Sequence, residues 1–212
     1  MSYQYPLNQL LTLGSILGEK NRPDYLSMGF QTDDIPELIR MSTDYELMAG
    51  HESDPKIWAA VHAWRVLGEL GALEAVSPLL NLYHELPGSL WTPKELPLVF
   101  AQIGPRAIQV LEKYLQDEGN NAFARIKVVR SLETMARQHQ QEHQRILSIL
   151  AEQLTAHQQN SESLNAYLVR SLVNLDADIH LATIEDAYKH QRVDQNISKL
   201  SLDEIKHKWG AG

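Results

Sequence analysis

The stretch of sequence that decides the fold is WAAVHAWRVLGEL, residues 58–70. Its apolar side chains recur at intervals of three and four residues, which places them on one face of an α-helix. A short turn and a second amphipathic stretch, residues 75–83, follow it. Elsewhere the same intervals recur, and no hairpin dipeptide joins two alternating runs. These patterns predict a helical hairpin in an all-α protein.

The hairpin recurs along the chain. Four copies align when Leu70, Ile103, Met135 and Leu175 share one column, with steps of 33, 32 and 40 residues between them. Those steps lie within or near the period of two-helix repeats. Two further columns remain apolar in every copy: Ala63, Leu96, Val128 and Leu168, and then Leu67, Phe100, Leu132 and Leu172. Because stacked repeats bury the same face in each copy, we expect a right-handed α-solenoid of stacked antiparallel helix pairs in a single domain.

The predicted repeats occupy residues 32–192, between an N-terminal cap, residues 1–31, and a C-terminal cap, residues 193–212. Apolar residues at 10–17 predict an amphipathic helix, which follows no basic segment and is too short to span a bilayer. Residues 32–35 introduce a helix expected over residues 34–48. Ser201 and Glu204 form a capping-box pattern that opens a last helix, ending near Gly210. We therefore expect a cytoplasmic protein with no membrane partner.

Charge and cysteine content exclude several classes of function. The chain has 19 Lys and Arg against 27 Asp and Glu, a net charge of -8, so phosphate backbones are repelled on average and nucleic acid is not an expected partner. It has no Cys, which excludes disulfides, thiolate catalysis and Cys-ligated zinc. It also contains no nucleophile elbow, phosphate-binding glycine loop or dinucleotide fingerprint. We expect no enzymatic activity.

Residues 58–70 and the following EAVSPLL, residues 74–80, resemble the helix pair of HEAT-type repeats. The chain is more closely similar to a family of bacterial HEAT-like proteins of unknown function, through residues 33–41 (DDIPELIRM), 95–105 (ELPLVFAQIGP) and 193–194 (VD). It is more distantly similar to the HEAT-like repeats of phycobilisome lyases. This resemblance covers most of the chain from about residue 24 onward. It implies a fold and no reaction, so function must be argued from the surface.

Three columns lie opposite the apolar face of the first helix in each pair. They contain His62, Glu95, Lys127 and Tyr167, then Arg65, Leu98, Arg130 and Arg170, and then Glu69, Gln102, Thr134 and Asn174. In a solenoid these side chains would stack into a polar strip with a row of arginines, which could bind a carboxylate ligand or an acidic peptide. A face that simply contacts water explains the same residues.

Trp58, Trp91 and Phe123 form one further column near the starts of successive first helices. Exposed aromatic residues in this arrangement would anchor an interface, and hydrophobic staples packed on the next turn are the alternative. Trp64 belongs on the core side with Leu67.

The letters HQQEH at residues 139–143 match the inverted zinc-peptidase motif, in which His139 and His143 would bind metal and Glu142 would act as base. The match falls in a Gln-rich stretch where one helix should give way to the next, and no third ligand is identifiable. We expect a solvated turn there, with no metal and no cofactor.

The leading hypothesis is a non-enzymatic scaffold that binds another protein or a peptide. Its expected partner-binding residues are Trp58, His62, Arg65, Glu69, Trp91, Glu95, Lys127, Arg130, Tyr167 and Arg170. The alternative, suggested by the lyase-type resemblance, is a bilin lyase-like protein that handles a tetrapyrrole. A zinc hydrolase built on residues 139–143 is the third hypothesis.

Overall fold

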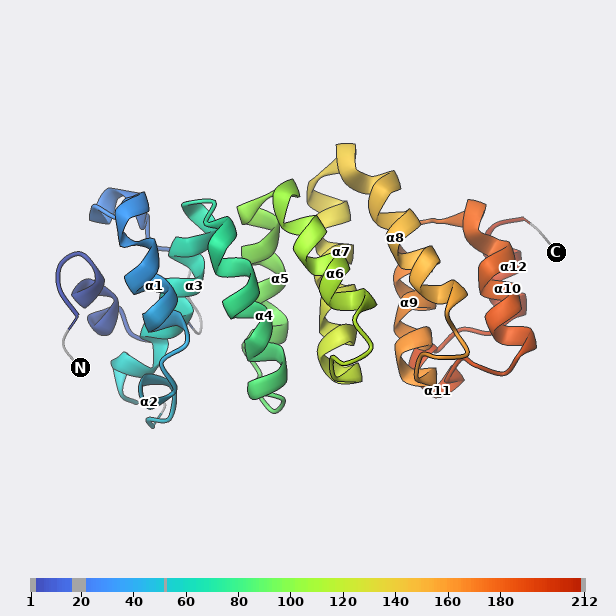
Figure 1. Cartoon of the computed structure of the whole chain (residues 1–212), viewed down its shortest axis with the longest axis horizontal. Helices are drawn as coiled ribbons and strands as arrows, with labels where there is room; N and C mark the ends of the chain where they lie inside the picture. Colours follow the sequence, from blue (N-terminus) through green and yellow to red (C-terminus); the bar gives the residue numbers. More distant parts are fainter. Residues whose placement is uncertain (1–2, 17–21, 52, 211–212) are drawn as a thin grey trace. The chain divides into compact units, whose positions relative to one another are not determined.

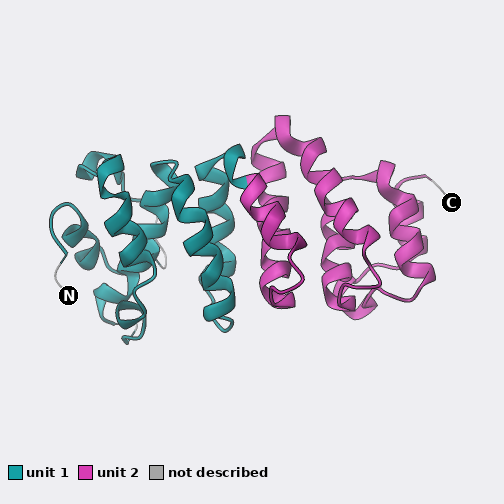
Figure 2. Cartoon of the chain, in the orientation of Figure 1, with its two compact units in different colours: residues 1–107 teal, residues 108–212 magenta. Residues whose placement is uncertain are grey.

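The computed structural model describes residues 3–16, 22–51 and 53–210, and every regular element in those ranges is a helix (Figure 1). The predicted all-α class is confirmed. The chain divides into two compact units, residues 1–107 and 108–212 (Figure 2). No helix in the described ranges combines the length and the apolar composition that crossing a bilayer requires. The solenoid arrangement, its handedness and the single-domain organisation stay predictions.

Unit 1 is built around one central helix. Its elements are η1 (Leu7–Thr12), η2 (Leu26–Met28), η3 (Thr32–Asp34), α1 (Ile35–Ser42), α2 (Tyr45–Met48), η4 (Pro55–Trp58), α3 (Ala59–Glu69), η5 (Leu73–Ala75), α4 (Val76–Glu85), α5 (Thr92–Ile103) and η6 (Pro105–Ala107). Helix α3 packs against both α1 and α5. Trp64 is buried, as expected, and its indole nitrogen donates to the main-chain oxygen of Ser42 at 2.8 Å.

The N-terminal predictions are only partly right. The expected helix over residues 10–17 is a 3-10 helix that ends at Thr12; residues 14–16 form no helix, and residue 17 lies outside the described ranges. The helix expected over residues 34–48 is divided into α1 and α2. The division has a local cause, because the Asp44 carboxylate accepts from the main-chain nitrogens of Glu46 and Leu47 and so starts a new helix.

Unit 2 contains the longest helix of the described chain. Its elements are α6 (Ile108–Gln116), α7 (Ala122–Gln138), η7 (Gln140–Glu142), α8 (His143–Thr155), α9 (Glu162–Asn174), η8 (Asp178–His180), α10 (Leu181–Lys189), α11 (Gln195–Ser198) and α12 (Leu202–Lys208). Helix α7 packs against α6, α8 and α9, and α8 also packs against α10. The predicted capping box at Ser201 and Glu204 is present at the start of α12.

The apolar columns of the alignment form the core of each unit. All eight members of the Ala63 and Leu67 columns are buried with no exposed surface. Helices α3 and α9 end one residue before Leu70 and Leu175, and α5 ends at Ile103. Helix α7 instead continues past Met135 to Gln138. The period of the pattern therefore locates the buried face well and the helix ends less well.

Polar side chains hold the turn between α8 and α9 in the interior of unit 2. The Asn160 amide donates to Asn165 Oδ1 and to the main-chain oxygen of Gln153, both at 2.9 Å, and its own Oδ1 accepts from Gln153 Nε2 at 2.9 Å. Asn165 donates in turn to the main-chain oxygens of His157 (2.9 Å) and Arg192 (2.7 Å). Because buried polar groups without partners cost free energy, this network favours one conformation of the turn that carries His157.

Candidate functional site

Two helices of unit 2 bring five of the predicted polar-column residues to one surface hollow. Arg130 and Thr134 come from α7, and Tyr167, Arg170 and Asn174 come from α9. The hollow has a volume of about 170 Å³, and Glu133 and Ser171 complete its lining. We call this site the α7–α9 hollow.

The charges of the α7–α9 hollow are its chief feature. Arg130 and Arg170 are exposed, and within the described residues neither guanidinium has a carboxylate at ion-pair distance. The Arg170 guanidinium lies 5.8 Å from the centroid of the Tyr167 ring, in reach of a cation–π contact. The guanidinium groups of Arg130 and Arg170 are therefore both available to donate hydrogen bonds to an anionic ligand.

Glu133 is the one carboxylate that lines the hollow, and neighbouring donors occupy it. It accepts from Ser171 Oγ at 2.7 Å, from Asn174 Nδ2 at 3.1 Å and from Arg137 at 3.0 Å. These bonds tie α9 to α7. Ser171 is buried, so this carboxylate acts mainly as a structural link between the two helices.

Lys127, the remaining predicted residue on α7, does not line the hollow. It is half-buried, and this burial lowers the pKa of its ammonium group. Its participation in binding stays a prediction.

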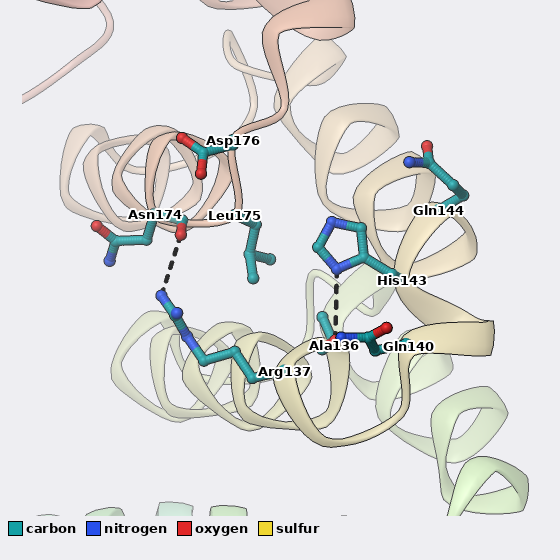
Figure 3. A pocket seen from close by; sticks show the side chains of 8 residues that line it. All are labelled: Ala136, Arg137, Gln140, His143, Gln144, Asn174, Leu175 and Asp176. Atoms are coloured by element: carbon teal, nitrogen blue, oxygen red, sulfur yellow. Dashed lines mark hydrogen bonds between the residues drawn. The ribbon is translucent and has the colours of Figure 1, made fainter. Parts of the chain in front are cut away.

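A second hollow of unit 2, about 580 Å³, lies at the C-terminal ends of α7 and α9 and shares Asn174 with the first (Figure 3). Arg137 donates across it to the main-chain oxygen of Asn174 at 3.1 Å, and His143 Nδ1 lies 3.3 Å from that of Ala136. Asp176 also lines it, and the hydrogen bond from Lys208 lowers the pKa of this carboxyl group. This second hollow therefore offers an anion no unpaired cation.

The HQQEH stretch forms the turn that we predicted, η7, which is followed directly by α8. Glu142 pairs with Arg145 at 3.4 Å. Across residues 3–16, 22–51 and 53–210, the one group of His, Asp and Glu side chains with metal-like spacing includes neither His139 nor Glu142 nor His143. The geometry gives no support to a zinc hydrolase at this turn.

In unit 1 the corresponding part of α3 is covered, and the prediction that His62 faces solvent is wrong. His62 has no exposed surface. Its Nδ1 lies 2.7 Å from the Tyr25 hydroxyl, and its Nε2 lies 2.9 Å from the main-chain oxygen of Gly14. The N-terminal segment of the chain thus folds over the face that the alignment left open.

Arg65 is not available to a partner either. Its guanidinium contacts both oxygens of Glu95, at 2.8 and 3.2 Å, and the two side chains are only 11% and 14% exposed. Glu69 lies 3.4 Å from Arg22, and its partial burial raises the pKa of its carboxyl group. In unit 1 the predicted polar residues therefore bind one another and the N-terminal segment.

The aromatic column also differs between the units: its members in unit 1 are buried or half-buried, and its member in unit 2 is exposed. Trp58 is buried, so the prediction of an exposed anchor is wrong for it; its ring packs edge-on against Trp91, with centroids 5.0 Å apart and planes at 72°. Trp91 is half-buried, and Phe123 in unit 2 is 72% exposed. Trp58, Trp64 and Trp91 line an apolar cavity of about 500 Å³ in unit 1.

Glu133 and Ser171 line the α7–α9 hollow, and Arg137 donates to Glu133 beside it, but none of the three was among the predicted site residues. The alignment selected residues that face directly away from the core, whereas these three lie beside those columns, where neighbouring helices meet. The sequence did contain one signal for this contact: Glu133 on one predicted first helix and Ser171 on the next can form a hydrogen bond.

No protein-family model, curated protein or solved structure matches the chain at a significant level. Membership of the HEAT-like family therefore stays a prediction.

Proposed function

We propose that the protein is a non-enzymatic scaffold of HEAT-like type, a right-handed solenoid of helix pairs, that binds an acidic segment of another protein. The observation that supports this proposal is the pair of exposed arginines, Arg130 and Arg170, at one polar hollow. A guanidinium presents a planar fork of donors that matches a carboxylate, and two such forks give orientation as well as affinity.

The size of the hollow favours an acidic side chain over a whole small molecule. Pockets for drug-sized ligands occupy roughly 300–1,000 Å³. The α7–α9 hollow, at about 170 Å³, is smaller. One carboxylate of a peptide fits that volume, with the rest of the peptide lying along the exposed surfaces of α7 and α9.

The direct test uses a fluorescent peptide rich in Glu and Asp, with binding followed by anisotropy. Replacing Arg130 and Arg170 together by Glu should weaken binding by about tenfold or more, because charge-assisted hydrogen bonds contribute roughly 1.5–3 kcal/mol each. The matched control replaces Arg106 and Lys113 by Glu. Both control residues are exposed, and the change in net charge is the same.

Equal weakening in the two double variants would mean that net charge, and not the hollow, determines binding. Affinity capture from a native cell extract, with the same variants and mass spectrometry, then identifies the natural partner. Arg65 is left unchanged in both experiments, because reversing its charge would oppose Glu95 inside the fold.

The cavity lined by Trp58, Trp64 and Trp91 supports a second candidate, a protein that handles a tetrapyrrole or another flat apolar ligand. Its volume of about 500 Å³ is within the range of small-molecule pockets. Leu90 also lines it and is 69% exposed. Mixing the protein with a tetrapyrrole should shift the absorption spectrum of the pigment, and Leu90→Glu should remove the shift. An unchanged spectrum would exclude a tetrapyrrole as the ligand of this cavity.

A further inference from the structure

Unit 2 brings together three side chains that neither the repeat pattern nor the proposed function uses. His157 lies in the turn after α8, Asp186 lies on α10, and His190 is the C-cap residue that directly follows α10. His157 Nε2 is 2.8 Å from Asp186 Oδ2, and His190 Nδ1 is 3.5 Å from Asp186 Oδ1. One nitrogen or oxygen from each of the three lies within 4.8 Å of the other two.

The backbone fixes the positions of these three side chains. His157 is 4% exposed, and its main-chain oxygen accepts from Asn165 at 2.9 Å and from Arg192 at 3.3 Å. Asp186 and His190 are four residues apart on one helix, so they project from the same face. The site is thus formed by a buried histidine from one element and an exposed pair from another.

The distances agree with those of a tetrahedral metal site. With bonds of about 2.0–2.1 Å to zinc, neighbouring ligand atoms lie about 3.3 Å apart, and the centroids of two bound imidazoles lie about 5 Å apart. The centroids of His157 and His190 are 5.2 Å apart. The separation of the two rings, and the 2.8 Å between His157 Nε2 and Asp186 Oδ2, are therefore close to ligand spacing.

The hydrogen bond of the His190 ring also suits ligation. His190 Nδ1 lies 2.9 Å from the main-chain oxygen of Asp186, and a proton donated there leaves the lone pair on Nε2. Such a bond from the second ring nitrogen to a carbonyl is the usual support of a histidine ligand. For His157, Nε2 faces Asp186 and would be the ligand atom, whereas the buried Nδ1 has no hydrogen-bond partner in the described ranges and so gives this ring no such support.

The charge of the cluster favours a cation. Asp186 supplies an exposed carboxylate, and within the described residues its ion-pair contacts are with the two histidines of the cluster. Lys189, on the same helix as Asp186, lies 3.8 Å from Glu185 and so has its own carboxylate partner. One carboxylate and two neutral imidazoles are ligands that zinc and similar divalent transition metals prefer, whereas magnesium and calcium prefer oxygen alone.

We propose that His157, Asp186 and His190 bind one divalent transition-metal ion, with zinc the best match. Asp186 and His190 are exposed, which leaves the outer side of the ion open to water. The ion would link the turn after α8 to α10 and so stabilise that part of unit 2. The site shares no residue with the α7–α9 hollow, so a test of metal binding does not depend on whether the hollow binds a peptide.

The test uses the full chain without a histidine tag, freed of metal by a chelator and titrated with zinc chloride by calorimetry. We expect about one zinc ion per chain, and a rise in Tm that the chelator reverses. His190→Ala and Asp186→Asn should each weaken zinc binding by about tenfold or more and remove the rise in Tm. Both residues are exposed, so both variants should fold, which circular dichroism checks.

His143→Ala is the matched control, because it removes a half-buried histidine from the motif that only resembles a zinc site. It should bind zinc as the wild type does. Three outcomes would overturn the proposal: no zinc bound by the wild type, unchanged affinity in His190→Ala, or equal loss in His143→Ala.

Discussion

The same columns of the sequence alignment lead to two different surfaces in the two units. In unit 1 the residues of α3 are covered: His62 lies beneath Tyr25 and Gly14, and Arg65 is paired with Glu95. In unit 2 the corresponding residues of α7 and α9, Arg130 and Arg170, remain exposed.

The difference comes from what packs onto each helix, since the aligned columns are the same. The N-terminal segment lies on α3, and Glu95 of α5 faces Arg65 at hydrogen-bond distance. In unit 2 the column partners of Glu95 are Lys127 and Tyr167, neither of which can neutralise an arginine. An arginine is thus available for binding only where its neighbour on the next helix is not a carboxylate.

The largest expected difference in stability between the units concerns charge reversal at Arg65 in unit 1 and at Arg130 in unit 2. Arg65→Glu places two carboxylates together in a mostly buried site and should lower the free energy of unfolding by about 3–5 kcal/mol. Arg130→Glu changes an exposed, unpaired residue and should cost less than about 0.5 kcal/mol. Urea denaturation of the two variants measures both values. Similar costs would show that Arg65 is as solvated as Arg130.

The next largest expected difference in stability concerns Tyr25 in unit 1 and Tyr167 in unit 2. Tyr25→Phe removes the hydroxyl that lies 2.7 Å from His62 Nδ1, leaving a buried nitrogen without that partner, and should cost about 1–3 kcal/mol. Tyr167→Phe is the matched change in unit 2, where within the described ranges the hydroxyl has no hydrogen-bond partner, and it should be nearly neutral. If thermal unfolding showed equal losses for both, the N-terminal segment would not cover α3 as the structure indicates.

The sequence predicted what depends on local periodicity. The buried columns, the turn at residues 139–143 and the capping box at Ser201 are local patterns, and all are confirmed. The covering of His62 is different, because it depends on a residue 37 positions away in an irregular segment. No helical period describes how such a segment packs.

The candidate sites divide along the same line. Arg130 and Arg170 belong to one column of the alignment, so the predicted stacking of helix pairs placed them near one another. The cluster of His157, Asp186 and His190 was missed, since its first two members are 29 residues apart and lie in different elements. The sequence alone shows only that Asp186 and His190 are four residues apart.

The smallest expected effect is a difference in the sign of pH dependence between the two units. Partial burial of Glu69 in unit 1 raises its pKa above the ordinary 4.5, so the ionised carboxylate is disfavoured in the fold. Its contribution should therefore lower the free energy of unfolding as pH rises from 4.5 through the raised folded value. In unit 2, Lys208 holds the pKa of Asp176 below the ordinary 3.8, so its stabilisation is complete above 3.8 and is lost as pH falls through the folded value.

Unfolding of the wild type, Glu69→Gln and Asp176→Asn, measured in steps between about pH 3 and 7, separates these contributions. The difference between wild type and Glu69→Gln should decrease with rising pH, and that between wild type and Asp176→Asn should increase. Both effects are small because solvent screens the two carboxylates, so the sign of each slope is the decisive quantity. If both stability differences changed with pH in the same direction, the charge of Arg22, 3.4 Å from Glu69, would outweigh the burial of Glu69. The covered carboxylate of unit 1 would then titrate like the exposed Asp176 of unit 2.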